Sequence, residues 1–310
     1  PRPWARTAFK WRNLLSTVLS AIIPVFLVAG AGYGLRRFLA LDTKTLSSLN
    51  IYLFIPCLVF SSISGRAIEW GVFGRYALAA IMLVAVMWGV LSALARRRGI
   101  EGDAYGAFLM TMFPNVGNFG LPVCMFAFGE AGLALAVVVM VCGSFLQNSL
   151  GVYFAQRNQH GMGKAFVRVF QYPMIYAFVL ALVFQRTGWH LPDLAGRAID
   201  ITADAAIPVQ LVILGIQLAE TKLETSANVF LASVTRLCGG PILACAMAWI
   251  VGLSGLDAKV FILQMSGPVA VGMAVYGGQF GVAPRFLAST ESWTFLCSIV
   301  TVASVLYFLM

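Results

Sequence analysis

Residues 112–122 read Met-Phe-Pro-Asn-Val-Gly-Asn-Phe-Gly-Leu-Pro and interrupt a long apolar run that extends from Ala104 to Gly129. Each proline in this stretch removes a backbone donor and clashes with the preceding turn, and each glycine adds backbone freedom. An α-helix therefore cannot continue through it. At the depth of a bilayer, such a break is tolerated only where it is buried in protein or lines a cavity.

The composition around this stretch is that of a membrane protein. Of the 310 residues, 60% are apolar and 11% are charged, and the mean hydropathy is +0.87. A soluble domain carries about 25% charged residues, so most of the outside of this chain must face lipid. The composition predicts an all-α polytopic membrane protein, because the apolar runs are continuous and do not alternate as the strands of a barrel would.

Cutting the chain at its charges gives ten runs of roughly the 20 residues that a helix needs to cross a bilayer. The predicted spans are Leu14–Leu35, Leu46–Ile63, Tyr76–Ala95, Ala104–Gly129, Ala131–Gln156, Val169–Gln185, Ile201–Ala219, Val229–Leu253, Val260–Gly281 and Leu287–Met310. The sixth is at the short limit of this range.

Several other classes of protein are excluded by the same sequence. The net charge is +9, but the basic residues are scattered between apolar runs and form no basic face for nucleic acid. The chain has no phosphate-binding loop for ATP and no hydrolase or metalloprotease motif. Its two histidines, His160 and His190, are too few for a histidine-rich metal site. We therefore expect no enzyme activity, no catalytic residues, no bound metal and no cofactor.

Charge indicates an orientation only when residues 1–13 are set aside as an N-terminal tail. With the tail counted, Lys and Arg number 9 on the side of both termini and 11 on the other side; without it they number 5 and 11. The positive-inside rule then places the connector 157–168 in the cytoplasm and both termini outside. A cleaved secretory signal is the alternative for the first run, although this run extends for 22 residues like a retained span.

The chain repeats landmarks at about half its length. Four pairs recur at offsets of 149–154 residues, namely Asp103 with Asp257, Pro114 with Pro268, Pro56 with Pro208, and Pro24 with Pro173. The two predicted units, residues 14–156 and 169–310, hold five spans each. An odd number makes the second unit enter the membrane from the opposite side, which is the inverted repeat of many secondary transporters. The alternative is that apolar helices with scattered prolines look self-similar by coincidence.

The second unit is interrupted at the equivalent place, where residues 264–272 read Gln-Met-Ser-Gly-Pro-Val-Ala-Val-Gly. Matched interruptions in inverted halves predict a binding site, since the start of each following half-helix points partial positive charge at the cavity and suits an anion. Proline kinks relieved by neighbouring helices are the alternative. The predicted substrate-binding residues are Pro114, Asn115, Gly117, Asn118, Gln147, Asn148, Ser266, Gly267 and Pro268.

Other residues inside the spans have two interpretations. Polar side chains such as those in the fifth span either line a substrate path or join helices by hydrogen bonds. Ionisable residues in spans are usually paired, cavity-facing or functional. Arg236, Asp204 and Glu291 are therefore candidates for attracting the substrate or for coupling, with solvation as the alternative for the last two. Gly30-x-x-x-Gly34 is a motif for close helix packing.

The sequence resembles the auxin efflux carrier (AEC) family over nearly its whole length. The sharpest similarity lies in residues 114–122, in Phe-Ala-Phe-Gly at residues 126–129, and in Gln-Asn-Ser at residues 147–149. The segments at residues 23–26, 32–34 and 55–60 are also similar to family signatures. Gly-Pro-Val-Ala-Val at residues 267–271 matches more loosely, because relatives often carry Met-Pro there, followed by polar residues.

The resemblance implies a ten-helix fold of two inverted five-helix repeats, with a scaffold, a moving transport domain, and broken fourth and ninth helices that cross at the substrate site. It implies transport of organic anions, such as auxin in plants and malate or malonate in some bacteria, by elevator-like alternating access. It also implies that both termini lie outside. The family pattern makes Asn115, Asn118, Pro114 and Pro268 crossover residues and turns Gln147 and Asn148 toward the site.

We therefore expect a multi-pass transporter of the inner (plasma) membrane that carries a small organic anion, a mono- or dicarboxylate. Its other partners are the lipid bilayer and a proton or sodium as coupling ion, and a homodimer is left open. A sodium-coupled symporter of the bile-acid transporter type is the alternative within transport. A non-transporting sensor or assembly module and, more remotely, a membrane enzyme are the alternatives from other classes.

Overall fold

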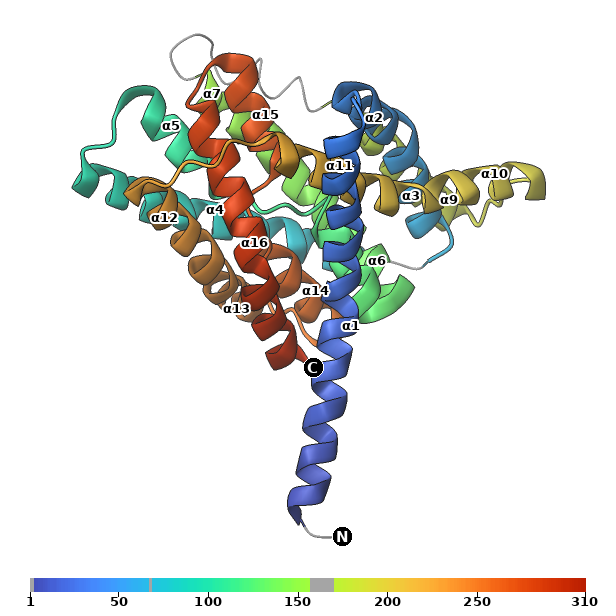
Figure 1. The fold of residues 1–310 in the computed structure, drawn as a ribbon. Helices are drawn as coiled ribbons and strands as arrows, with labels where there is room; N and C mark the ends of the chain where they lie inside the picture. Colours follow the sequence, from blue (N-terminus) through green and yellow to red (C-terminus); the bar gives the residue numbers. More distant parts are fainter. Residues whose placement is uncertain (1–2, 67–68, 157–169) are drawn as a thin grey trace.

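The computed structural model describes residues 3–66, 69–156 and 170–310, and these form helices joined by short connections (Figure 1). Seven helical segments within these ranges are long and apolar enough to cross a membrane. They confirm the prediction of an all-α polytopic membrane protein. The predicted cytoplasmic connector 157–168 lies outside the described residues.

Helices form where the sequence predicts spans, but several spans consist of more than one helical element. The elements of the first half are α1 (Pro3–Phe38), α2 (Thr43–Leu49), η1 (Asn50–Phe54), α3 (Ile55–Ser64), α4 (Trp70–Arg98), α5 (Gly102–Met110), α6 (Gly120–Leu146), η2 (Gln147–Gly151) and α7 (Val152–Ala155). Those of the second half are α9 (Pro173–Thr187), α10 (Asp193–Asp204), α11 (Ala206–Glu220), α12 (Ala227–Val234), η3 (Thr235–Gly239), α13 (Gly240–Ile250), α14 (Gly255–Met265), α15 (Val271–Phe280) and α16 (Pro284–Leu309). The η elements are π-helical turns that continue the neighbouring α-helices.

Residues at the helix ends explain where several elements begin and end. Asp42 caps α2 by accepting a hydrogen bond from the backbone N–H of Lys44, and Ser226 caps α12 by accepting one from Val229. Gly99 ends α4 in the left-handed conformation that glycine adopts without strain, directly after three arginines. These ends lie where the sequence changes from apolar to polar.

The N-terminal helix extends further than the sequence predicts. α1 begins at Pro3, so residues 3–13, predicted as a tail, form its first turns. Figure 1 shows this part of α1 projecting beyond the rest of the molecule, and α16 running toward the same side.

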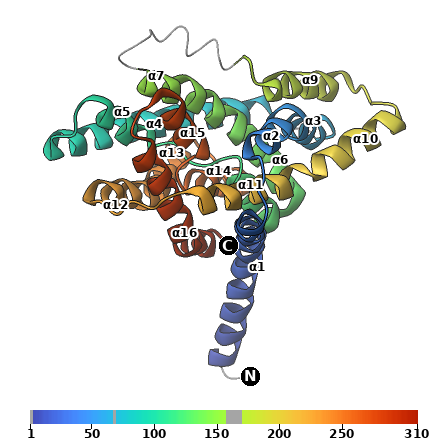
Figure 2. The same ribbon diagram turned by 45° about the horizontal axis from the view of Figure 1, so that its top comes forward.

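One group of helices contains α1, α2, α3, α9, α10 and α11. α1 packs along α11, and α3 packs against α9 and α10 (Figure 1 and Figure 2). Glycines allow the first contact: a Cβ on Gly215 would lie 1.8 Å from the carbonyl oxygen of Ala29, and a Cβ on Gly32 would collide with the backbone of α11. The predicted close packing at Gly30 and Gly34 is wrong, because neither Cβ position has a neighbouring atom within 4 Å.

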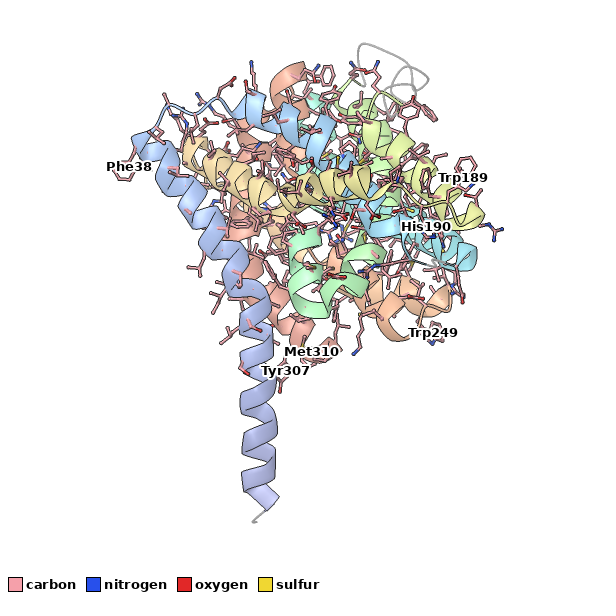
Figure 3. All side chains as sticks on the ribbon, turned by 90° about the vertical axis from the view of Figure 1, so that its right-hand side faces the viewer. Phe38, Trp189, His190, Trp249, Tyr307 and Met310 are labelled. Atoms are coloured by element: carbon pink, nitrogen blue, oxygen red, sulfur yellow. The ribbon has the colours of Figure 1, made fainter. Side chains whose placement is uncertain are left out.

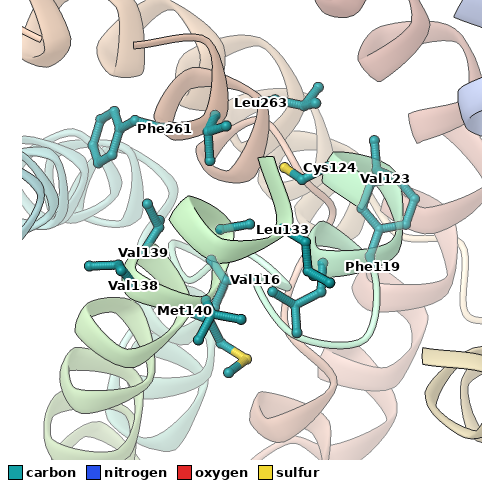
Figure 4. Close-up of a cluster of buried hydrophobic side chains, with 14 of the residues drawn as sticks. Val116, Phe119, Val123, Cys124, Leu133, Val138, Val139, Met140, Phe261 and Leu263 are labelled. Atoms are coloured by element: carbon teal, nitrogen blue, oxygen red, sulfur yellow. The ribbon is translucent and has the colours of Figure 1, made fainter. Parts of the chain in front are cut away.

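The second group, α4 to α7 and α12 to α16, packs around the two interrupted spans. α14 lies against α6 and α13, and α13 packs against α4. Val116 and Phe119, which lie between α5 and α6, belong to a buried apolar cluster with residues of α6 and α14 that include Met140 and Phe261 (Figure 4). Their burial fixes the position of the chain between α5 and α6.

The outer surface of the molecule is apolar. Phe38, Trp249 and Phe308 are 88%, 83% and 83% exposed. Figure 3 shows Phe38 and Trp249 at opposite ends of the molecule. Large apolar side chains on the outside of a polytopic protein face lipid, and aromatic rings are common at the two membrane surfaces. The surface therefore agrees with the composition.

Candidate substrate site at the crossing of two interrupted spans

Both predicted interruptions are present. α5 and α6 are separated by residues 111–119, and α14 and α15 are separated by residues 266–270. We call these segments the first break and the second break. Pro114 and Pro268 lie within them, and each removes a donor that a continuous helix would need.

The two breaks run antiparallel past each other and are joined by backbone hydrogen bonds. The N–H of Asn115 donates to the carbonyl oxygen of Pro268 at 2.8 Å, and the N–H of Ala270 donates to that of Phe113 at 2.9 Å. These two bonds form an isolated antiparallel β-bridge. The interrupted spans therefore meet at their breaks, although more than 150 residues separate them in the sequence.

Arg236 of η3 lies at this crossing and binds carbonyl oxygens on both sides of it. The residue is 1% exposed. Its guanidinium donates to Met112 at 2.8 Å, to Gly267 at 3.2 Å, and to Met265 at the end of α14. Carbonyl groups at a helix C-terminus carry partial negative charge, so a buried cation satisfies them. Arg236 thus stabilises the crossing.

A cavity of about 440 Å³ adjoins the crossing. Its walls come from α2, η1, α11 and the start of α9 in one group of helices, and from the first break, α6, η2 and α15 in the other. The predicted site residues that line it are Asn115, Gly117, Asn118, Gln147 and Asn148. The remaining lining residues include Thr43, Lys44, Ser47, Asn50, Ser144, Tyr172, Gln217, Ala270, Val271, Gly272 and Tyr276.

Several polar groups of the lining residues have no partner in the described part of the chain. Asn115 is 5% exposed and Asn50 is 3% exposed. The side-chain nitrogen of the first, the side-chain oxygen of the second and the side-chain oxygen of Gln217 make no hydrogen bond. The backbone N–H groups of Gly117 and Asn118 also donate to no other described residue. Because buried polar groups are normally satisfied, the three unpartnered side-chain atoms favour a polar ligand, and Gly117 and Asn118 are half-buried at the same wall.

Other lining side chains hold one another in place. Gln147 donates from Nε2 to the carbonyl oxygen of Pro114, and the hydroxyl of Tyr276 donates to Oδ1 of Asn148. The hydroxyls of Tyr172 and Tyr276 lie 3.2 Å apart and connect the start of α9 with α15. Gln147 and Asn148 therefore line the cavity and also join elements, so both interpretations of the fifth span apply to them.

The charges around the cavity favour an anion. Lys44 is the only lysine or arginine among the lining residues, and no aspartate or glutamate of the described chain lines the cavity. Val271 and Gly272 place the first turn of α15 at its wall. The N–H groups of a first helical turn have no partner in the helix and carry partial positive charge. A carboxylate is a group that such a wall binds well.

The other predicted site residues do not line this cavity. In the second break, the hydroxyl of Ser266 donates to a carbonyl of its own helix at 2.6 Å, and the carbonyls of Gly267 and Pro268 accept the bonds described above. Asp204 is exposed at the end of α10. Glu291 lines a neighbouring pocket. Residues 3–66, 69–156 and 170–310 contain no group of three or more metal-ligating side chains.

The lining residues that sequence reasoning missed include Lys44, Asn50, Tyr172 and Tyr276. Asn50 carried a signal, because it is the only amide side chain in the predicted second span and a buried amide needs a partner. The two tyrosines carried none, since aromatic residues are common in spans and most of them face lipid or other helices.

Comparison with known proteins identifies the family. The sequence model of a family described as membrane transport protein matches residues 17–165 and, separately, residues 160–306. The chain belongs to this family. Its relatives include an auxin efflux carrier, so the resemblance to the auxin efflux carrier family is confirmed. As a member of a transporter family, the chain is not an enzyme.

Three relatives in this family illustrate the range of similarity. An "Uncharacterized transporter" of Methanothermobacter thermautotrophicus is 30% identical over 270 residues, which cover 84% of this chain and 86% of the relative. The "Putative malonate transporter" of Rhizobium meliloti is 24% identical over 94% of this chain and 96% of the relative. The plant protein "Auxin efflux carrier component 8" of Arabidopsis thaliana is 25% identical over 47% of this chain and 42% of the plant protein.

Proposed function

We propose that this membrane transport protein is a secondary active transporter that carries a small organic anion, a mono- or dicarboxylate. The cavity at the crossing carries this proposal, because it combines unpartnered amide groups, the first turn of α15 and Lys44, and has no acidic side chain among its described lining residues. Two relatives support a carboxylate, since the Rhizobium meliloti protein has malonate in its name and the Arabidopsis thaliana protein has auxin.

The geometry suggests how a carboxylate would bind. Its oxygens would accept hydrogen bonds from the side-chain nitrogen of Asn115 and from the backbone N–H groups of Gly117 and Asn118, close to the positive end of α15. Lys44 is exposed and would attract the anion from water. The free side-chain oxygen of Asn50 would accept a hydrogen bond from a hydroxyl or N–H of the substrate.

The proposed architecture consists of ten spans in two inverted five-helix units, residues 14–156 and 169–310. The antiparallel pairing of the two breaks supports it, as do the two separate family matches, which meet near residue 160. Two helix contacts also support it. α1 in the first span of one unit packs on α11 in the second span of the other unit, and α9 in the first span of the second unit packs on α3 in the second span of the first. The interrupted spans are then the fourth and the ninth.

The proposed mechanism is elevator-type alternating access in the plasma membrane. The group that contains α1, α3, α9 and α11 would be the scaffold, and the group that contains the crossing would move against it. The lining of the cavity by both groups supports this division. In this proposal both termini lie outside the cell, as the charge distribution without the tail favours.

Thermal unfolding of the purified protein tests binding, because a ligand that binds only the folded state raises Tm. Malonate and auxin are the first probes, and we expect a concentration-dependent rise with at least one of them. Asn115→Ala should remove most of this rise, since a lost hydrogen bond to a charged group costs about 1.5–3 kcal/mol, or roughly tenfold to a hundredfold in affinity. Asn228→Ala in α12, outside the cavity lining, is the matched control.

Uptake of radiolabelled malonate into proteoliposomes tests transport. We expect uptake with the wild type and with Asn228→Ala, and strongly reduced uptake with Asn115→Ala at equal amounts of folded protein. Uptake that requires sodium, with choline as the replacement, would favour a sodium-coupled symporter. Binding without uptake would favour a sensor or assembly module. If neither carboxylate binds or crosses the membrane, the proposal is wrong.

A further inference from the structure

A second pocket of about 440 Å³ adjoins the substrate cavity. Thr43, Gln217, Val271 and Val275 line both spaces. Apart from these shared residues, the walls of the second pocket come from α11 and the connection that follows it, and from α15 and α16. This pocket therefore also lies between the two groups of helices, and Glu291 of α16 lines it.

Glu291 is a buried residue whose carboxylate has no partner among the residues that the structure describes. The residue is 5% exposed, and its carboxylate forms no hydrogen bond or ion pair with another described residue. Two other glutamates differ from it: Glu220 pairs with Arg36 at 2.7 Å, and Glu130 pairs with Arg66. The substrate cavity described above does not use Glu291.

A carboxylate in such a place has two low-energy states. An ionised carboxylate that is buried without a partner is costly, so it either takes up a proton or pairs with a cation. Lys222 and Arg285 line the same pocket and are exposed. Lys222 follows α11, in the group proposed as the scaffold, whereas Glu291 belongs to the other group. A movement between the two groups would therefore change the distance between the side chains of Lys222 and Glu291.

We propose that Glu291 is the proton-binding residue that couples a proton to the movement of the organic anion. This inference rests on the proposed transport function. Glu291 takes one proton from water in the pocket when it is unpaired, as it is here, and returns the proton to water when the movement brings Lys222 of the opposite group within ion-pair distance. The neutral carboxylic acid favours binding of the anion next to it, because it places no negative charge beside the substrate cavity.

Two exposed charged residues lie near Glu291 in sequence or in space. Arg285 is on α16 itself, and Glu224 follows α11, where its N–H donates to the hydroxyl of Ser289 and its carbonyl accepts from the indole of Trp293. Glu220, which lines the pocket, is paired with Arg36 of α1. Arg236 of η3, which packs against α16, donates to backbone carbonyls. α12 and α15, which also pack against α16, contain no charged residue. α1, α5 and α14 contact α16 as well; the charged residues of α1 lie near its two ends, and α5 and α14 carry Asp103, Asp257 and Lys259 close to their first turns. A sodium ion would be repelled by Lys222 and Arg285 in the same pocket, so a proton is the favoured cation.

Malonate uptake into proteoliposomes with and without an imposed pH gradient tests this inference. One pH unit corresponds to about a tenfold driving force for each coupled proton, so we expect wild-type uptake to rise several-fold when protons and malonate can enter together. Glu291→Gln keeps the shape of the side chain and cannot titrate. This variant should lose the response to the gradient but keep malonate exchange at equal pH on both sides.

Two further variants complete the experiment. Glu291→Asp should keep part of the response to the gradient, and Glu130→Gln, on an exposed ion pair, should respond like the wild type. Wild-type exchange that ignores the gradient would overturn the inference but leave the proposed transport function intact, as would an undiminished response of Glu291→Gln. A wild type that neither binds nor exchanges malonate would overturn both. If Glu291→Gln does not fold, the wild type and Glu291→Asp still decide the question.

Discussion

The first and second breaks occupy matching places in the two halves of the chain, yet they contribute differently to the cavity. Asn115 and Asn118 of the first break line it, and of the second break only Ala270 does. The first break leaves backbone N–H groups without an acceptor in the described chain. In the second break, Ala270 donates to the first break, and Val269 donates to the hydroxyl of Thr294 at 3.0 Å.

The difference follows from the length and composition of the two segments. The first break has nine residues and two amide side chains, whereas the second has five residues and Ser266 as its only polar side chain. In the short segment, every backbone N–H group donates: those of Ser266 and Gly267 to the end of α14, and those of Val269 and Ala270 to α16 and the first break. In the proposed site, the first break therefore provides the donors, and the second ends where the N-terminus of α15 begins. Matching segments of the two proposed repeats thus contribute unequally to the proposed site.

The largest expected effect comes from Arg236, which binds both breaks. Arg236→Met leaves the carbonyls of Met112, Gly267 and Met265 without this donor, at a cost of about 1–3 kcal/mol for each buried group left unsatisfied. We expect a much lower Tm in detergent or a failure to fold. Arg66→Met, on an exposed pair, should cost only about 0–1 kcal/mol. Equal Tm values for the two variants would show that the crossing does not depend on Arg236.

The glycines that follow the two breaks should respond unequally to an added methyl group. A Cβ on Gly120 would lie 2.0 Å from Oε1 of Gln264, whose Nε2 donates to Ala136, so Gly120→Ala should cost about 1–3 kcal/mol through overpacking. The Cβ position of Gly272 has no neighbouring atom within 4 Å. Gly272→Ala should keep Tm and weaken malonate binding only by narrowing the cavity.

Thermal unfolding with and without malonate separates these two effects. Gly120→Ala should have a lower Tm than the wild type in the absence of ligand. Gly272→Ala should show a smaller rise in Tm than the wild type when malonate is added. The same loss of Tm in both variants without ligand would contradict the unequal packing of the two breaks.

The smallest effect is expected for Ser266→Ala. Its hydroxyl donates within its own helix and does not line the cavity, so the Kd for malonate should stay within about twofold of the wild type, less than ~0.5 kcal/mol. Asn118→Ala in the first break should raise this Kd by about tenfold. Calorimetric titration of both variants measures the contrast. If they lose the same affinity, the second break also takes part in recognition.

Most of the fold could be predicted from the sequence because its determinants act locally. A proline removes a backbone donor in any surroundings, so both breaks followed from the positions of Pro114 and Pro268. Arg236 could not be assigned in this way. Its place inside a span made it a candidate for attracting the substrate or for coupling, whereas its partners are carbonyl oxygens of two distant segments.

Tertiary packing explains the remaining differences. Gly30 and Gly34 have the spacing of a packing motif, but that spacing does not tell which face of α1 meets α11, and Gly32 lies at the contact instead. Asn50 and Tyr276 come from spans far apart in the sequence, so only the fold brings them to one cavity.

The prolines also fix the alignment of the two breaks. A shift of one residue in one direction would put Pro114 where Asn115 now donates, and Pro114 has no N–H to offer. A shift in either direction would turn each side chain to the opposite face, and Asn115 would point away from the cavity. The two backbone hydrogen bonds therefore allow only this alignment of the breaks. We expect the two breaks to move as one unit when the surrounding helices move.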